Sequence, residues 1–175
     1  LAEPWMSLFY AWTLAYMGQT DAVERHLKHA EQGLASENKE NAQHLSGHIA
    51  AIRTFLAKLN GEMAESIQLA NTALAHLPVD DFKTRSFVAA MLGTALQATG
   101  DIEAAAQAYK TAVFTSRQAG NSHMAVHALC DLVGLQLLQG RLNQAEATCR
   151  EALQLAGDSA KNSGRPLPGA AYAHA

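Results

Sequence analysis

This sequence of 175 residues lacks most features that mark exported, membrane-spanning or disulfide-rich proteins. It contains two cysteines and four prolines. No run of about 18 uncharged apolar residues occurs, although a membrane-spanning helix needs that length. A basic segment followed by a signal-peptide core is also missing at its start. We therefore expect a cytoplasmic domain with no membrane segment.

Charge is also scarce. Charged residues make up 17% of the chain, against about 25% in a typical globular protein. The formal net charge is −3, and Lys and Arg form no basic stripe of the kind that grips phosphates. The sequence therefore argues against direct nucleic-acid binding by this segment. Hydrophobic residues make up 49%, which is enough for a continuous core.

Motifs of catalysis are missing as well. The sequence has no Gly-x-Ser-x-Gly elbow, no His-Glu-x-x-His and no phosphate-binding loop. The adjacent carboxylates Asp80 and Asp81 are expected to cap a following helix. Cys130 and Cys149 have apolar neighbours and are expected to be buried thiols. We therefore expect no enzymatic activity, cofactor or metal site in this segment.

The sequence does contain an internal repeat. A glycine followed by a polar residue closes an apolar stretch four times, at spacings of 43, 39 and 40 residues. An alanine returns twelve residues after each of these glycines. The glycines are Gly18, Gly61, Gly100 and Gly140, and the alanines are Ala30, Ala73, Ala112 and Ala152. This periodicity is typical of stacked helical hairpins.

The third block carries the fullest pattern, with Gly93, Leu96, Tyr109 and Ala112 in the small and aromatic order of a tetratricopeptide repeat. Good helix formers dominate and no β-branched run of strand length occurs. We therefore predict an all-α, tetratricopeptide-like superhelix of antiparallel helical hairpins, with about four repeats and the start of a fifth. The hairpins are expected near residues 4–35, 43–77, 81–119 and 122–157, with a truncated fifth repeat at 166–175. They form a single helical-repeat domain, expected to be a fragment of a larger protein.

Polar residues and glycines also predict where helices start and end. Asp21, Asp101 and Asn121 precede helical stretches and are expected to accept hydrogen bonds from free amide groups. Gly120 and Gly157 are expected to end helices in the left-handed conformation.

The first helix of each hairpin in such a stack lines the concave face. Placing the turn glycines at position fifteen aligns the four blocks. Position two then holds Trp5, His48, Phe87 and His127, position nine holds Trp12, Phe55, Thr94 and Gly134, and position twelve holds Ala15, Lys58, Gln97 and Leu137. Aromatic faces with polar tips suit a sugar, a small aromatic metabolite or an extended peptide. Packing in the seam between helices is the alternative for each ring.

Two arginines extend this candidate site. Arg53 stands where the repeat pattern expects leucine, and Arg85 lies near the start of the next first helix. Either can clamp a carboxylate or phosphate, and the alternative is a structural salt bridge or a snorkelling side chain. The candidate ligand-binding residues are thus Trp5, Trp12, Tyr16, Arg53, Phe55, Lys58, Arg85, Phe87 and Gln97.

Histidine pairs raise the question of a metal site. His44 and His48, and His123 and His127, are spaced to share a helix face. The two pairs fall two repeats apart, roughly 20 Å if neighbouring first helices are about 10 Å apart, so they cannot share an ion. No carboxylate or cysteine is placed to complete either pair. We expect solvated surface pairs.

The order of these motifs resembles a known family. The segments are Tyr10-Ala11-Trp12, Ile49 to Ala57 before Gly61-Glu62, Gly100 to Ala105, Leu137 to Leu142 and Gly164 to Pro168. Together they look like the helical-repeat region of bacterial LuxR-family regulators of the maltose-activator (MalT) type. The resemblance covers nearly the whole chain.

The resemblance implies a regulator with three parts: an ATPase module, a helical superhelix that senses an inducer, and a helix-turn-helix that binds DNA. This chain would be the superhelix, and ATP would bind only in a separate domain. Its expected partners are a small-molecule effector or peptide in the groove, the other domains of the parent protein, and a second copy through self-association. The alternative function is a scaffold that binds a peptide or partner protein.

Overall fold

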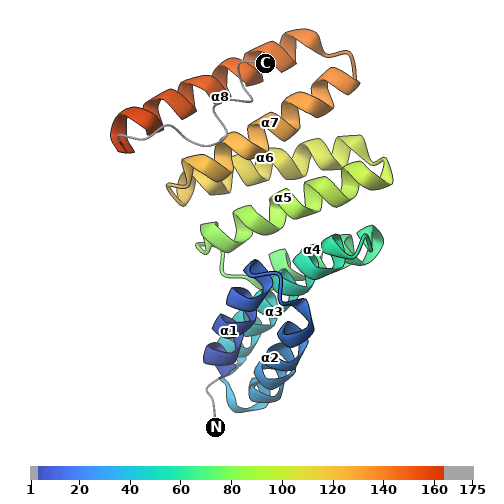
Figure 1. The fold of residues 1–175 in the computed structure, drawn as a ribbon, viewed down its shortest axis with the longest axis vertical. Coiled ribbons are helices and arrows are strands. Elements are labelled where there is room, and N and C mark those ends of the chain that lie inside the picture. The colour runs from blue at the N-terminus through green and yellow to red at the C-terminus, as the bar shows by residue number, and fades with distance from the viewer. Residues whose placement is uncertain (1–3, 164–175) are drawn as a thin grey trace.

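The computed structural model describes residues 4–163, and these residues form eight α-helices and no β-strand. The helices pair in chain order as antiparallel hairpins (Figure 1). The pairs are α1 (Pro4–Tyr16) with α2 (Thr20–Gly33), α3 (Lys39–Leu59) with α4 (Met63–His76), α5 (Phe82–Thr99) with α6 (Ile102–Gln118), and α7 (Ser122–Leu138) with α8 (Leu142–Ser163). A short 3-10 turn, Leu34–Ser36, follows α2. The all-α helical repeat predicted from the sequence is confirmed.

The hairpins stack along the long axis of the molecule (Figure 1). Helix α4 packs broadly on α5, and α6 packs broadly on α7, whereas α2 meets α3 over a much smaller area. The first helices also touch in a row, α1 against α3, α3 against α5, and α5 against α7. We call the surface along α1, α3, α5 and α7 the first-helix face. The row matters for function because it brings side chains from successive repeats together.

The turn of every hairpin contains a glycine with a positive φ, and the third hairpin adds a side-chain cap. Gly100 ends α5 with a φ of 88°, and its amide donates to the carbonyl of Gln97. This left-handed conformation favours glycine because a Cβ would clash with the backbone. Asp101 follows, and its carboxylate accepts from the amide of Ala104 at the start of α6. One residue pair therefore ends one helix and begins the next.

Small residues fill the seams between the helices. The repeated alanines Ala30, Ala73, Ala112 and Ala152 are all almost completely buried. Gly93 in α5 lies against the ring of Tyr109 in α6, which is the largest fully buried side chain of the described residues. Small side chains let helix axes approach closely, so large neighbours can fill the remaining space. The sequence repeat is thus a repeat of close contacts.

Some predicted helix ends are right and others wrong. Asn121 caps α7 by accepting from Met124, and Asp81 caps α5 by accepting from Thr84. Asp21 does not cap: α2 begins earlier, at Thr20, and its N-cap residue makes no side-chain bond. Gly157 does not end a helix, because α8 continues to Ser163.

Three further expectations concern the cysteines, the fifth repeat and membrane segments. Cys130 and Cys149 are half-buried rather than buried. The predicted fifth repeat at 166–175 lies outside the described residues. Within residues 4–163, no helix combines the length and apolar character needed to cross a membrane.

Candidate ligand-binding groove

Four aromatic rings from three successive first helices meet on the first-helix face. Trp12 and Tyr16 of α1 are stacked, with ring centroids 5.6 Å apart. Phe87 of α5 lies 5.5 Å from Trp12, 6.3 Å from Tyr16 and 5.8 Å from Phe55 of α3. We call these four residues the aromatic cluster. The structure therefore brings together side chains that are far apart in the sequence.

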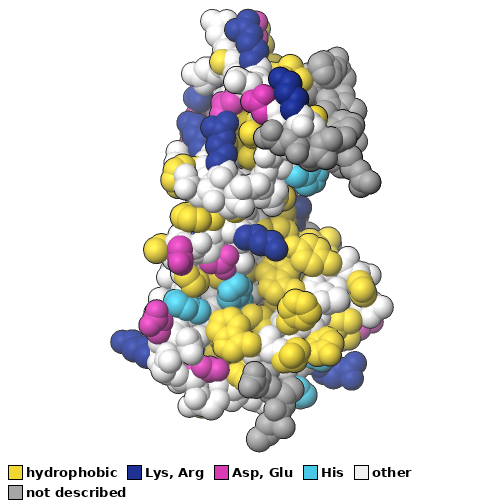
Figure 2. Space-filling model, turned by 90° about the vertical axis from the view of Figure 1, so that its left-hand side faces the viewer, with side chains coloured by type: hydrophobic (Ala, Val, Ile, Leu, Met, Phe, Trp, Pro, Cys, Tyr) yellow, Lys and Arg dark blue, Asp and Glu magenta, His cyan; other side chains and the backbone are white. Residues whose placement is uncertain are grey.

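Trp12, Tyr16 and Phe87 of the aromatic cluster line an open groove with a volume of about 520 Å³, whereas the candidate residue Phe55 contacts the cluster but is not part of the groove lining. Its walls are mostly apolar, and polar groups come from α1, α3 and α5. Tyr16 remains 67% exposed, so most of its surface is accessible to a ligand. The lining residues are Trp5, Leu8, Phe9, Trp12, Thr13, Tyr16, His48, Lys83, Thr84 and Phe87. In Figure 2, hydrophobic side chains gather over the lower half of the molecule, which contains α1 in Figure 1.

His48 of α3 also lines the groove. Its ring meets the ring of Trp5 edge-on at 5.9 Å, and its Nε2 lies 3.4 Å from the carboxylate of Asp81. Its Nδ1 is buried and makes no hydrogen bond with a described residue. Burial lowers the pKa of His48, Asp81 opposes this effect and His44 adds to it. The expectation that His48 belongs to a solvated surface pair is therefore wrong.

Lys58 of α3 and Gln97 of α5 do not line the aromatic groove. Gln97 accepts a hydrogen bond of 3.0 Å from the hydroxyl of Tyr109. At Asp131 of α7, burial raises the pKa of the carboxyl group, while the charges of His127 and Lys58 lower it. The structure therefore does not bring Lys58 and Gln97 into the aromatic groove.

Arg53 lies outside the groove. Its guanidinium donates to Glu24 at 2.7 Å and to both carboxylate oxygens of Glu31 at 2.5 and 3.2 Å. Both acids belong to α2, so the arginine joins two helices that otherwise meet over a small area. These hydrogen bonds to Glu31 and Glu24 also raise the pKa of Arg53. The structure supports the salt-bridge alternative for this residue.

Arg85 is likewise engaged by the fold. Its guanidinium donates to the backbone carbonyls of Leu74 at 2.8 Å and Leu77 at 3.2 Å. These carbonyls belong to the last turn of α4 and the residue after it. Carbonyls at the end of a helix have no amide group of the same helix from which to accept a hydrogen bond. Arg85 therefore holds the end of α4 against α5, and it does not line the groove.

Sequence reasoning missed several groove residues. Phe9 is 68% exposed in the groove, and Lys83 and Thr84 line it at the start of α5. Phe9 falls between the aligned positions, but the spacing of Trp5, Phe9, Trp12 and Tyr16 by three or four residues puts it on the same helix face. That spacing was the available signal. Lys83 and Thr84 carry no comparable pattern.

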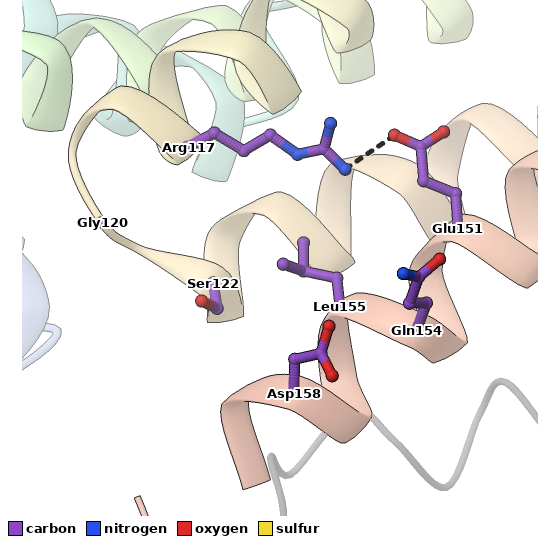
Figure 3. A pocket seen from close by; sticks show the side chains of 7 residues that line it. All are labelled: Arg117, Gly120, Ser122, Glu151, Gln154, Leu155 and Asp158. Carbon is purple, nitrogen blue, oxygen red and sulfur yellow. Dashed lines mark hydrogen bonds and ion pairs between the residues drawn. The ribbon is translucent and has the colours of Figure 1, made fainter. Parts of the chain in front are cut away.

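A second cleft, of about 320 Å³, lies where the link between α6 and α7 meets α8 (Figure 3). Arg117 points across it to Glu151, with a nitrogen–oxygen distance of 2.7 Å. Gln154 and Asp158 extend from α8 beside this pair. Since the arginine is already neutralised by a carboxylate, we interpret this cleft as a joint between the last two hairpins.

The described residues provide no cluster for a metal ion, since no three His, Cys, Asp or Glu side chains converge. His123 and His127 contact each other at 4.9 Å, and both are exposed, as expected for a surface pair. The aromatic groove instead offers a ligand stacking on its rings, apolar contact and a few polar groups.

Comparison with known proteins agrees with this architecture. A family model described as the MalT-like TPR region matches residues 47–174. The HTH-type transcriptional regulator MalT of Cronobacter sakazakii is 27% identical over 155 residues, and that of Serratia proteamaculans is 24% identical over 155 residues. Each alignment covers 89% of this chain and 17% of the relative, so the chain spans less than a fifth of their length. The chain belongs to the MalT-like family of tetratricopeptide-type repeat regions.

Proposed function

We propose that this chain is the effector-sensing repeat module of a LuxR-family transcription regulator. Family membership supports a regulatory repeat region. The observation that carries the sensing role is the aromatic cluster, because its rings come from three hairpins and three of them, Trp12, Tyr16 and Phe87, line an open groove. A ligand in this groove contacts several repeats at once.

Such contact couples binding to the shape of the stack. A ligand that touches α1, α3 and α5 favours the arrangement in which all three helices present their rings to it. The ligand can change the curvature of the superhelix by as much as its binding free energy differs between this arrangement and the alternative one. In the parent protein, this change would release or drive self-association. ATP hydrolysis and operator binding would belong to separate domains, and the whole regulator would act in the cytoplasm.

The chemistry of the groove favours a compact ligand with a flat apolar face. Aromatic rings bind such faces by stacking or edge contact. Among the lining residues, Thr13 and Thr84 supply hydroxyl groups and Lys83 supplies an ammonium group. Small-molecule sites commonly combine an apolar wall with a few polar groups that orient the ligand.

Tryptophan fluorescence and thermal unfolding test this function together. Both tryptophans of the sequence, Trp5 and Trp12, line the groove, so a bound ligand should change their emission. A metabolite panel should include ligands that raise the melting temperature in proportion to the logarithm of concentration over Kd. Phe87→Leu should weaken both responses, by about tenfold in Kd if one stacking contact of about 1.4 kcal/mol is lost.

Phe114→Leu is the matched control, because Phe114 is exposed on α6 and lies outside the groove lining. It should leave both responses unchanged. If no small molecule shifts the emission or melting temperature, while a defined peptide does, the chain is a peptide-binding scaffold. If Phe87→Leu and Phe114→Leu behave alike, the aromatic cluster is structural packing and the sensing proposal fails.

A further inference from the structure

The aromatic groove carries one positive charge and no negative charge. Among the described residues that line it, Lys83 of α5 is the only one that is fully charged at neutral pH, and none is Asp, Glu or Arg. Burial lowers the pKa of His48, another lining residue, so its ring is neutral at about pH 7.5. A ligand in the groove therefore meets mostly apolar walls and a single ammonium group.

The fold itself gives no reason for a lysine at position 83. Its ammonium group makes no hydrogen bond or ion pair with any residue between 4 and 163. The first turn of a helix favours acidic side chains, because the free backbone amides there carry partial positive charge. The first turn of α5 has no acid and instead contains Lys83 and Arg85. Arg85 is explained by its bonds to the carbonyls at the end of α4, whereas Lys83 places a free charge where the helix does not favour it.

Thr84, the next residue, brings a hydroxyl group to the same groove. This hydroxyl makes no hydrogen bond with any described residue, whereas the hydroxyl of Thr13 already donates to the carbonyl of Phe9 at 3.0 Å. Asp81, the nearest acid in the sequence, accepts from the backbone amide of Thr84 and lies 3.4 Å from the ring of His48. The start of α5 thus offers the groove two donors that lack an acceptor.

Building on the proposed function, we propose that the effector is a flat aromatic carboxylate and that Lys83 selects its charge. The ring of the ligand stacks on the wall formed by Trp12, Tyr16 and Phe87, and its carboxylate accepts hydrogen bonds from Lys83 and Thr84. A single lysine matches a single negative charge, whereas a phosphate dianion is better matched by the fork of an arginine. The groove volume of about 520 Å³ lies within the range of about 300–1,000 Å³ that small-molecule sites occupy.

Calorimetry with three naphthalene probes tests the charge preference of the native chain. 2-Naphthoate carries the carboxylate, 2-naphthamide has nearly the same shape without the charge, and 2-naphthylmethylamine carries an ammonium group. 2-Naphthoate should bind about fivefold more tightly than 2-naphthamide, a modest ratio because Lys83 is exposed to solvent. 2-Naphthylmethylamine should bind more weakly than the amide. The preference for the carboxylate should shrink in about 1 M salt, where charges are screened.

Two substitutions of Lys83 test its part in this preference. Lys83→Gln should lower the affinity for 2-naphthoate to that for 2-naphthamide and leave the affinity for the amide unchanged. Lys83→Glu should reverse the order, so that the ammonium probe binds most tightly. An acidic side chain in the first turn favours the helix, so Lys83→Glu should keep or raise the melting temperature. A lost carboxylate response in this variant then does not come from unfolding.

Lys110→Gln on α6 is the matched control, because Lys110 is exposed and lies outside the groove lining. It should leave all three affinities unchanged. If the native chain binds 2-naphthoate and 2-naphthamide equally, or if Lys83→Gln and Lys110→Gln have the same effect, the carboxylate proposal is wrong, while the aromatic groove and the sensing role remain. If none of the three probes binds the native chain, the proposed function fails together with this proposal.

Discussion

Gly93 and Tyr109 are packed so closely that a Cβ on Gly93 would stand 2.6 Å from Cε1 of the tyrosine ring. The ring cannot withdraw easily. It is only 1% exposed, and its hydroxyl is held by a hydrogen bond to Gln97. The seam between α5 and α6 therefore depends on the absence of a single methyl group.

Gly93→Ala should consequently destabilise the chain. Overpacking of a filled core costs about 1–3 kcal/mol, and the free energy of unfolding in urea should fall by that amount. Gly134→Ala is the matched control in a neighbouring first helix, because its added Cβ meets no atom within 4 Å. This control should raise the unfolding free energy by about 0.5–1 kcal/mol. Equal effects of the two variants would show that the seam relaxes around the methyl group.

Arg53→Met should destabilise the chain without weakening ligand binding. The substitution removes the bonds to Glu24 and Glu31 and leaves two carboxylates of α2 unpaired. All three side chains are partly exposed, so the expected loss is about 1 kcal/mol. The difference from the native chain should shrink in about 1 M salt, where charges are screened. A weakened ligand response with unchanged stability would restore the original prediction that Arg53 binds the effector.

Arg85→Met should loosen the end of α4. The guanidinium bonds to the carbonyls of Leu74 and Leu77 are lost, and a cost of about 1–2 kcal/mol is expected for polar groups left without partners. Relative to the native chain, this variant should show faster hydrogen exchange of the amides in the last turn of α4, while exchange in α6 should change little. Uniform acceleration across both helices would contradict this local role.

Histidine 48 should make stability depend on pH. Its pKa is lowered from 6.5 in the folded chain, chiefly by burial, so the unfolded chain binds the proton more readily. Stability is therefore complete above pH 6.5 and falls as the pH drops towards the folded-state pKa. In His48→Gln, the urea midpoint should change less between about pH 7.5 and 5.5 than in the native chain. An unchanged or steeper dependence would mean that Asp81 overcomes the effect of burial on His48.

The fold was predictable because it depends on local, repeated chemistry. Gly100 and Asp101 mark a turn whose geometry needs no distant partner, and Ala112 marks a seam where only a small side chain fits. The same alignment placed Phe55 and Phe87 on one face, and the structure brings their rings within 5.8 Å.

The arginines were harder to interpret because their partners are distant in the sequence. Glu24 and Glu31 precede Arg53 by 29 and 22 residues, and nothing in one sequence distinguishes them from other acids. Arg85 binds backbone carbonyls, which no sequence pattern displays. His48 was misplaced for a similar reason, since its burial depends on Trp5 and Asp81 from other helices.

The aromatic cluster also has a mechanical consequence. Its rings cross-link α1, α3 and α5, so bending that part of the stack must disturb several ring contacts at once. No such ring joins α5 to α7 among the described aromatic contacts, and these two helices meet over a small area. Pulling the first three hairpins apart must therefore break ring contacts, whereas the last hairpin is held mainly through α6, which packs broadly on α7.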